Sequence, residues 1–401
     1  MKMKTKTKTK RHLLLLLLCG WVSTGQATDV INEDFSSFGS IDITTTSCNG
    51  WALYKCAWRN RANAGYAIAF NYDTTSKYYG YAESPAFTGL PENRNAILTF
   101  CYAQSAKDKA SQFTVTLKQQ GHIREANATE IAKNNKITVD ANSTTFQTKT
   151  CYLYGASTAS TLEFKSSSQT GNYATIDDVV VTIADQTSLS ESATNTVDAA
   201  KVADVTLTRT LTGGIWNTLC LPFDVDMTTL SLALGEGQDI QLRTFSSYAD
   251  GIINFTSANS INAGTPFLIK LNTTVENPTF PVVNLETTAA QTVTHGDVSM
   301  VGVYSPYVLP ENGVFLSTDG KLKKPSERSR EMKGLRAFFT IPSNQQQNAR
   351  IFIDNSTSGI AETEGTTVGS DDWHSLDGRR LSGRPTTKGL YICNGKKMIL
   401  K

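Results

Sequence analysis

The chain has 401 residues, of which 39% are hydrophobic and 18% are charged, and its formal net charge is +2. The first 27 residues hold six of the 38 basic side chains and none of the 36 acidic ones, so the remainder carries a formal net charge of −4. A mildly acidic chain without a basic run that neutralises phosphates is not expected to bind nucleic acid.

Residues 1–27 have the pattern of a signal peptide. Five lysines and Arg11 form a basic segment, an apolar segment runs from Leu13 to Val22, and small residues at Gly25 to Ala27 fit a cleavage site. The apolar segment is about half the roughly 20 residues that a membrane helix needs, so no transmembrane segment is expected. We therefore predict an exported protein, located at the cell surface or outside the cell.

Residues 28–185 are predicted to form a first β domain. Short runs rich in Val, Ile, Phe and Tyr are separated by turn residues, and no helical period is sustained. In "QFTVTLKQ", Phe113, Val115 and Leu117 alternate with threonines, which is the period of a half-buried strand. The run "YATIDDVVVTI", which begins at Tyr173, is predicted to be the closing strand of this domain.

The rest of the chain is predicted to hold a second β domain and a tail. Residues 186–200, rich in Ser, Thr and Ala, are predicted to be a linker, and the second domain spans residues 201–358. An acidic linker follows at 359–371, and the tail at 372–401 carries two hairpin signals, Asp-Gly and Asn-Gly. The predicted fold class is all-β, with two consecutive jelly-roll-like β-sandwiches and a small C-terminal hairpin.

Six cysteines follow the leader, an even number that permits disulfides in an exported protein. The nearest pairs along the chain are the predicted ones: Cys48 with Cys56, and Cys101 with Cys151. Cys220 and Cys393 lie in apolar runs, which fit buried thiols equally well.

Two motifs suggest what kind of domain comes first. With "NEDFSS" from Asn32 near its start and "IDDVVV" from Ile176 near its end, it resembles the jelly rolls of cleaved adhesins and carbohydrate-binding proteins. The resemblance implies that the first and last strands pair, and that their carboxylates hold a structural calcium. It thereby makes Glu33, Asp34 and Asp177 the candidate ligands, since calcium takes six to eight oxygen ligands.

The second domain and the tail carry resemblances of their own. The stretches "LTRTLTGGIWNTLCLPFDV", "AGTPFLIK", "VGVYSPYVLPENGVFLS" and "GLRAFFTIP" resemble a module of exported proteins from Bacteroides-type bacteria, whose role is unknown. The tail, through "LDGRRL" and "GLYICNGKKMILK", is similar to the C-terminal sorting domains of type IX secretion.

Asp177 poses a separate question of chemistry. Alternation along the strand places it on the apolar face with Val179 and Val181, and places Asp178 on the other face. A carboxylate on the buried face needs a partner. Three interpretations are open: a calcium ligand, an acceptor for backbone N–H groups at the strand start, or a catalytic acid.

Aromatic side chains gather between Trp51 and Tyr81. Core packing is one role for them, and stacking on sugar rings is another, because flat amphipathic rings suit both. Four of them lie in polar surroundings and are the candidate ligand-binding residues: Trp58, Tyr78, Tyr79 and Tyr81.

The residues give little support to an enzyme. Three histidines, His122, His295 and His374, lie in three separate segments. They do not have the spacing of zinc ligands, and no pattern pairs them with a nucleophilic side chain. We assign no catalytic residue and require no cofactor beyond the possible calcium. The paired carboxylates of a glycosidase follow no spacing rule, so a glycan-active hydrolase is kept as a third interpretation.

The favoured prediction is a secreted or cell-surface, non-enzymatic binding protein. Its first domain would recognise a glycan or a host protein, in the manner of an adhesin. The alternative is a structural or assembly component of the cell surface without a soluble ligand.

Overall fold

The computed structural model describes residues 28–39, 41, 44–61, 65–70, 79–104, 111–167, 174–326, 330–353, 356–359, 373–375, 379, 381, 385–393 and 396–400. Over these residues the predicted all-β fold is confirmed: strands dominate, and the single α-helix among them is α1 (Met227–Leu234). No described helix is long and apolar enough to span a membrane.

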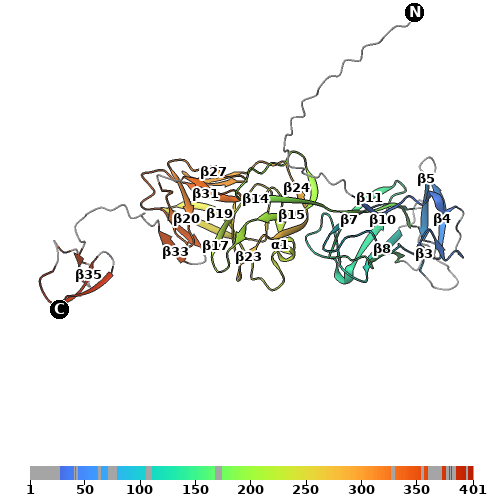
Figure 1. Cartoon of the computed structure of the whole chain (residues 1–401), viewed down its shortest axis with the longest axis horizontal. Coiled ribbons are helices and arrows are strands. Elements are labelled where there is room, and N and C mark those ends of the chain that lie inside the picture. The colour runs from blue at the N-terminus through green and yellow to red at the C-terminus, as the bar shows by residue number, and fades with distance from the viewer. Residues whose placement is uncertain are drawn as a thin grey trace, which may run out of the picture.

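The first domain consists of two sheets packed around one core (Figure 1). The seven-stranded sheet has the order β4-β5-β13-β7-β11-β9 with β1 beside β13, and its strands are β1 (Asp29–Glu33), β4 (Cys56–Arg61), β5 (Gly65–Phe70), β7 (Ala96–Gln104), β9 (His122–Glu125), β11 (Gln147–Tyr154) and β13 (Ala174–Ile183). The six-stranded sheet has the order β10-β8-β12-β6-β3-β2, from β2 (Ser47–Cys48), β3 (Trp51–Tyr54), β6 (Tyr81–Glu83), β8 (Ser111–Lys118), β10 (Lys136–Ala141) and β12 (Thr161–Ser166).

Alternating apolar residues build the core between these sheets. Phe113, Val115 and Leu117 of β8 are buried as their spacing predicts. Phe100 of β7 contacts Phe113 and Phe164 edge to face, with ring centroids 6.1 and 5.3 Å apart. The first strand, β1, pairs antiparallel with the closing strand, β13, which confirms the pairing that the resemblance implied.

The segment predicted to be a linker begins instead with a strand. β13 ends at Ile183, and after the single residue Ala184, which is fully buried, β14 (Asp185–Ser190) enters the second domain and runs parallel with β15 (Lys201–Thr208). Beyond β14, the Asn195 side chain donates to the Tyr304 carbonyl over 2.7 Å. The serines and the threonine of β14 were misleading because they occupy exposed or half-buried positions of a strand, while Leu189 is buried in the core of the second domain.

The second domain contains two larger sheets and a third built on β15. The third has the order β14-β15-β24, where β24 is Thr279–Leu285. The six-stranded sheet is β17 (Trp216–Leu219), β22 (Phe267–Lys270), β19 (Gln241–Ala249), β20 (Ile252–Ala258), β32 (Arg350–Ile353) and β33 (Ser356–Gly359), and the five-stranded sheet is β25 (Thr292–His295), β26 (Val298–Val303), β31 (Arg336–Thr340), β28 (Gly313–Leu316) and β29 (Leu322–Lys323). Short pairs join β16 (Thr210–Leu211) to β23 (Val275–Glu276), β18 (Val225–Asp226) to β21 (Ser260–Ile261), and β27 (Tyr307–Val308) to β30 (Glu331–Met332).

The tail forms a small sheet of its own from β34 (Trp373–His374), β35 (Gly389–Cys393) and β36 (Lys396–Leu400). Cys393 faces Lys396 across the β35–β36 pair, so the Asn-Gly signal marks a hairpin as predicted. The Asp-Gly signal lies outside the described residues.

Side chains of both domains meet at the junction, where they form what we call the Arg124 clasp: Arg124, Tyr152, Tyr154, Asp226 and Thr229. Arg124 lies 5.7 and 5.6 Å from the ring centroids of the two tyrosines, and its Nη1 is 3.3 Å from Asp226 Oδ2. Asp226 also caps α1 by accepting the Thr229 amide over 2.7 Å. The clasp therefore ties the outer face of the first domain's larger sheet to a helix terminus of the second.

A second polar contact lies beside the clasp. Asn95 Nδ2 donates to Asp204 Oδ1 over 3.0 Å, and the Val282 amide donates to the same oxygen over 2.9 Å. Burial raises the pKa of Asp204, and these hydrogen bonds partly offset that rise. The Ala184 amide donates to the Asn95 carbonyl over 2.9 Å, and the Arg94 guanidinium donates to the Ala184 carbonyl. Hydrogen bonds thus fix the one-residue connection on both sides.

The predicted disulfide between Cys101 and Cys151 is absent among the described cysteines. On the paired strands β7 and β11, Cys101 faces Thr148 and Cys151 faces Leu98. The two cysteines are therefore three positions out of register, roughly 10 Å along the strands. A disulfide requires Cα atoms within about 7 Å of each other.

The predicted disulfide between Cys48 and Cys56 is likewise absent from the described part of the chain. Cys56 Sγ donates to the Tyr81 carbonyl over 3.0 Å, whereas Cys48 Sγ lies 4.0 Å from the Phe38 carbonyl. Burial raises the pKa of Cys56 to about 12, which keeps it a thiol.

Candidate functional site

The outer face of the six-stranded sheet follows from simple alternation. In β3, Trp51 and Leu53 are buried and Tyr54 points outward; in β6, Ala82 is buried and Tyr81 points outward. Because the side chains of paired residues lie on the same face, register decides which outward side chains become neighbours.

Register brings five outward residues into one line across the sheet. Tyr54 pairs with Tyr81, Tyr81 with Lys165, Lys165 with Thr114, and Thr114 with Thr138. We call these five residues the recognition row. Adjacent strands are about 4.8 Å apart, so the row spans roughly 19 Å.

Two stacked tyrosines form one end of the row. The ring centroids of Tyr54 and Tyr81 are 5.6 Å apart and the ring planes make an angle of 23°. Both side chains are half-buried, so one part of each packs on the sheet and the other faces solvent. The pair, which we call the tyrosine platform, offers a flat aromatic surface with hydroxyl groups at its edge.

Beside the row, on the same face, charged side chains pair with one another. Lys118 Nζ is 2.7 Å from Glu83 Oε2 and 3.8 Å from Glu163 Oε2, and Thr161 Oγ1 donates to Glu83 Oε1 over 2.7 Å. Burial acts to raise the pKa of Glu83, but the hydrogen bonds from Lys118 and Thr161 outweigh it and the pKa falls. The hydrogen bond to Glu83 raises the pKa of Lys118.

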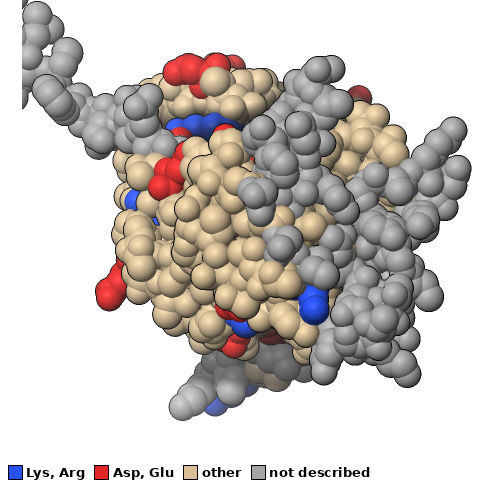
Figure 2. Space-filling model, turned by 90° about the vertical axis from the view of Figure 1, so that its right-hand side faces the viewer, with Lys and Arg blue, Asp and Glu red and all other residues tan. Residues whose placement is uncertain are grey.

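Lys165 differs from these paired charges. Among the described residues no carboxylate lies within ion-pair distance of its ammonium group, and its carbonyl accepts the Thr114 hydroxyl over 3.4 Å. Figure 2 shows the end of the molecule where β3, β4 and β5 lie, and the centre of its described surface is largely tan, with the red and blue side chains mainly toward the edges. The row therefore presents aromatic rings, hydroxyl groups and one cation for recognition.

Of the four predicted ligand-binding residues, the structure describes the side chains of Tyr79 and Tyr81. Tyr81 belongs to the platform, and Tyr79, which precedes β6, is half-buried. Trp58 lies on β4, which belongs to the other sheet, and its side chain is outside the described part, as is Tyr78. Tyr54 was not predicted as a ligand-binding residue, although the alternation in "WALY" already separates it from Trp51 and Leu53.

The three predicted calcium ligands each accept hydrogen bonds from neighbouring groups. Glu33 Oε1 accepts the Phe35 amide over 2.9 Å, Asp34 Oδ1 accepts the Ser36 amide over 2.9 Å and the Ser36 hydroxyl over 2.7 Å, and Asp177 Oδ1 accepts the Asp178 amide over 2.8 Å. Within the described part of the chain no three His, Cys, Asp or Glu side chains gather as metal ligands. The described carboxylates thus do not form a ligand set, and calcium stays a prediction.

The position of Asp177 explains its hydrogen bond. It is 1% exposed and lies at a β-bulge in β13, where the register to β7 shifts between Asp177 and Val180. Asp178 adopts a positive φ of 47° at the bulge and is exposed, as predicted. Asp and Asn tolerate this left-handed conformation better than most residues, so the sequence Asp-Asp suits the bulge.

No protein-family model matches the chain, and no curated protein matches its sequence. Among solved structures, the K3 cleaved adhesin domain of Lys-gingipain from Porphyromonas gingivalis is 17% identical over 39% of this chain and 99% of that domain, with a TM-score of 0.28. The CBM22-1 xylan-binding domain of Xyn10C from Paenibacillus barcinonensis is 11% identical over 39% of this chain and 95% of that domain, with a TM-score of 0.27. An arabinose-bound MgGH51 α-L-arabinofuranosidase is 12% identical over 38% of this chain, with a TM-score of 0.29, and the match spans only 26% of that enzyme.

Proposed function

We propose that the chain is an exported, non-enzymatic binding protein whose first domain recognises a glycan through the recognition row. The observation that carries the proposal is the half-exposed tyrosine platform in register with Lys165 and two threonines. Aromatic rings stack on the C–H faces of sugars, while hydroxyl and ammonium groups supply hydrogen bonds to sugar hydroxyls. In this protein the aromatic rings, the hydroxyl groups and the ammonium group all lie on one face of one sheet.

One specific observation argues against the alternative that the protein is a glycan-active hydrolase. Glu83 and Glu163 face each other across β6 and β12, the arrangement closest to a glycosidase pair on this face. A general acid needs a raised pKa, because it must hold its proton at working pH. The pKa of Glu83 is lowered instead, since Lys118 and Thr161 stabilise its carboxylate.

A glycan array probed with residues 28–401 tests the proposal. Wild-type protein should bind a defined set of glycans, and Tyr54→Ala or Tyr81→Ala should weaken that binding at least about 10-fold, below detection on the array. Tyr307→Ala is the matched control, because Tyr307 is also an exposed tyrosine that stacks on a ring, Phe338, but lies in the second domain. Binding that survives both platform variants would refute the proposal.

Mucin and its deglycosylated form distinguish a glycan from a protein ligand. Recognition of a glycan predicts binding only to the glycosylated form. Equal binding to both forms would assign the surface to a protein partner instead.

A further inference from the structure

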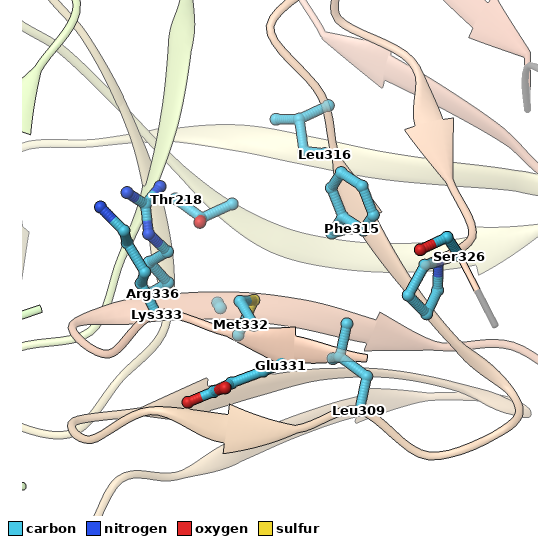
Figure 3. Close-up of a pocket in the computed structure, with 11 residues that line it drawn as sticks. Thr218, Leu309, Phe315, Leu316, Ser326, Glu331, Met332, Lys333 and Arg336 are labelled. Atoms are coloured by element: carbon cyan, nitrogen blue, oxygen red, sulfur yellow. The ribbon is translucent and has the colours of Figure 1, made fainter. Parts of the chain in front are cut away.

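The second domain holds a cavity of about 430 Å³, separate from the recognition row (Figure 3). Residues of β17, β28, β30 and β31 line it. Figure 3 shows Arg336 and Lys333 together on one side, with Phe315 and Ser326 toward the other. The volume falls in the range of small-molecule pockets, about 300–1,000 Å³.

One wall of the cavity is apolar because the cavity opens onto the edge of a hydrophobic cluster. Leu309 is buried in that cluster together with Phe338, and Phe315 and Met332 pack against it while lining the cavity. A ligand in contact with Phe315 and Met332 would remove their remaining apolar surface from water, which favours an apolar body.

The other wall is cationic, and a single carboxylate holds its charges in place. Glu191 Oε1 is 2.6 Å from Lys333 Nζ, and Glu191 Oε2 is 2.6 Å from Arg336 Nη2 and 3.9 Å from Arg209 Nε. Three cations therefore surround one acid, and the cations remain in excess when Glu331 of the lining is also counted.

Arg209 accounts for this excess of positive charge, since Lys333 and Arg336 alone would balance Glu191 and Glu331. Its side chain is fully buried and donates to the Leu335 carbonyl, but its Nε and Nη2 have no hydrogen-bond partner. A buried guanidinium with unmet donors increases the positive potential that Arg336 and Lys333 present at the cavity.

We propose that this cavity binds a small ligand with an apolar body and an anionic head group. The head group meets Arg336 and Lys333, whose positions are already fixed by Glu191, so little side-chain entropy is lost on binding. Arg336 retains N–H donors beyond the one bonded to Glu191. The body lies against Phe315 and Met332.

Two fluorescent probes test the proposal on residues 28–401. 8-Anilinonaphthalene-1-sulfonate has an aromatic body and an anionic head group, and N-phenyl-1-naphthylamine has the same body without the charge. The anionic probe should bind saturably and at least about 10-fold more tightly than the neutral one, a difference of about 1.4 kcal/mol. Equal affinity, or no saturable binding of the anionic probe, would overturn the proposal.

Three variants locate the binding. Lys333→Gln, at a side chain that is 59% exposed, should weaken the anionic probe several-fold and leave the neutral probe unchanged. Phe315→Ala should weaken both probes. Lys324→Gln is the matched control, because Lys324 is an exposed lysine just before the lining residue Pro325 but does not itself line the cavity, and it should change neither probe. Equal effects of Lys333→Gln and Lys324→Gln would contradict a site at the cavity, and circular dichroism checks that each variant is folded.

Discussion

At the scale of single residues, the chemistry of Asp177 could be predicted only in part. Asp177 is buried and Asp178 is exposed, as predicted, but the predicted face was wrong, because the bulge interrupts the alternation: Asp177 pairs with Cys101 and Val180 with Thr99, so Asp177 shares a face with Val180 and not with Val179 and Val181. The bulge that supplies its backbone donor was not predictable, because a bulge depends on how β13 pairs with β7. Local spacing therefore identified the buried carboxylate but not its hydrogen-bond donor.

The hydrogen bond to Asp177 predicts an order of stabilities. Asp177→Ala removes the acceptor and should cost about 1–3 kcal/mol, whereas Asp177→Asn keeps an oxygen at that place and should cost less. The other interpretation of Asp177 is that it binds a structural calcium ion. Thermal melting with and without a chelator tests that interpretation. A fall of several degrees with the chelator is expected if the carboxylates hold calcium as predicted, and an unchanged midpoint would count against the ion.

Glu191 predicts how stability depends on pH. Burial acts to raise its pKa, but Lys333 and Arg336 outweigh burial, so its pKa in the folded state lies below the ordinary value of 4.5. Its ionised form therefore stabilises the fold above about pH 4.5, and this contribution is lost as the pH falls through the folded-state pKa. Glu191→Gln should cost about 2–3 kcal/mol at pH 7, because it leaves the buried Arg209 without its carboxylate. The difference from wild type in urea unfolding should shrink as the pH is lowered below 4.5, and a difference independent of pH would contradict this account.

At the scale of elements, the sequence predicted strands better than their partners. Alternation identified β8 correctly, and the hairpin signal located the turn between β35 and β36. The recognition row escaped detection because Tyr54, Tyr81, Lys165 and Thr114 come from four strands that are distant along the chain. Only the pairing register makes them neighbours, and no local pattern encodes it.

Strand β14 yields a prediction that a linker would not. Leu189 is 3% exposed in the core of the second domain, so Leu189→Ala should lower the free energy of unfolding by about 3 kcal/mol. Gln186→Ala, at an exposed position of the same strand, is the matched control and should be close to neutral. Chemical denaturation of both variants measures the difference, and equal stabilities would mean that β14 contributes nothing to the core.

At the scale of the whole molecule, the two domains are joined as one unit rather than by a flexible linker. Figure 1 shows them side by side along the long axis, with β14 passing from one to the other. The Arg124 clasp and the hydrogen bond between Asn95 and Asp204 also connect the two domains. The second domain therefore holds the recognition row in a fixed orientation.

Removal of Arg124 should loosen this arrangement. Arg124→Ala eliminates the ion pair with Asp226 and the contacts with both tyrosine rings. The loss of cation–π contacts in a buried setting lowers the free energy of unfolding by about 2 kcal/mol or more. Small-angle X-ray scattering should then show a larger and more variable maximum dimension. Lys136→Ala, at an exposed lysine of the first domain, is the control, and identical scattering by the two variants would show that the clasp does not fix the domains.

The central claim is that the tyrosine platform binds a glycan, and isothermal titration calorimetry with a glycan selected on the array tests it most directly. We predict that Tyr81→Ala weakens the affinity at least about 10-fold, which corresponds to about 1.4 kcal/mol. Tyr307→Ala should leave the affinity within about two-fold of wild type, a difference of less than ~0.5 kcal/mol. Equal affinities of wild type and Tyr81→Ala would contradict the account.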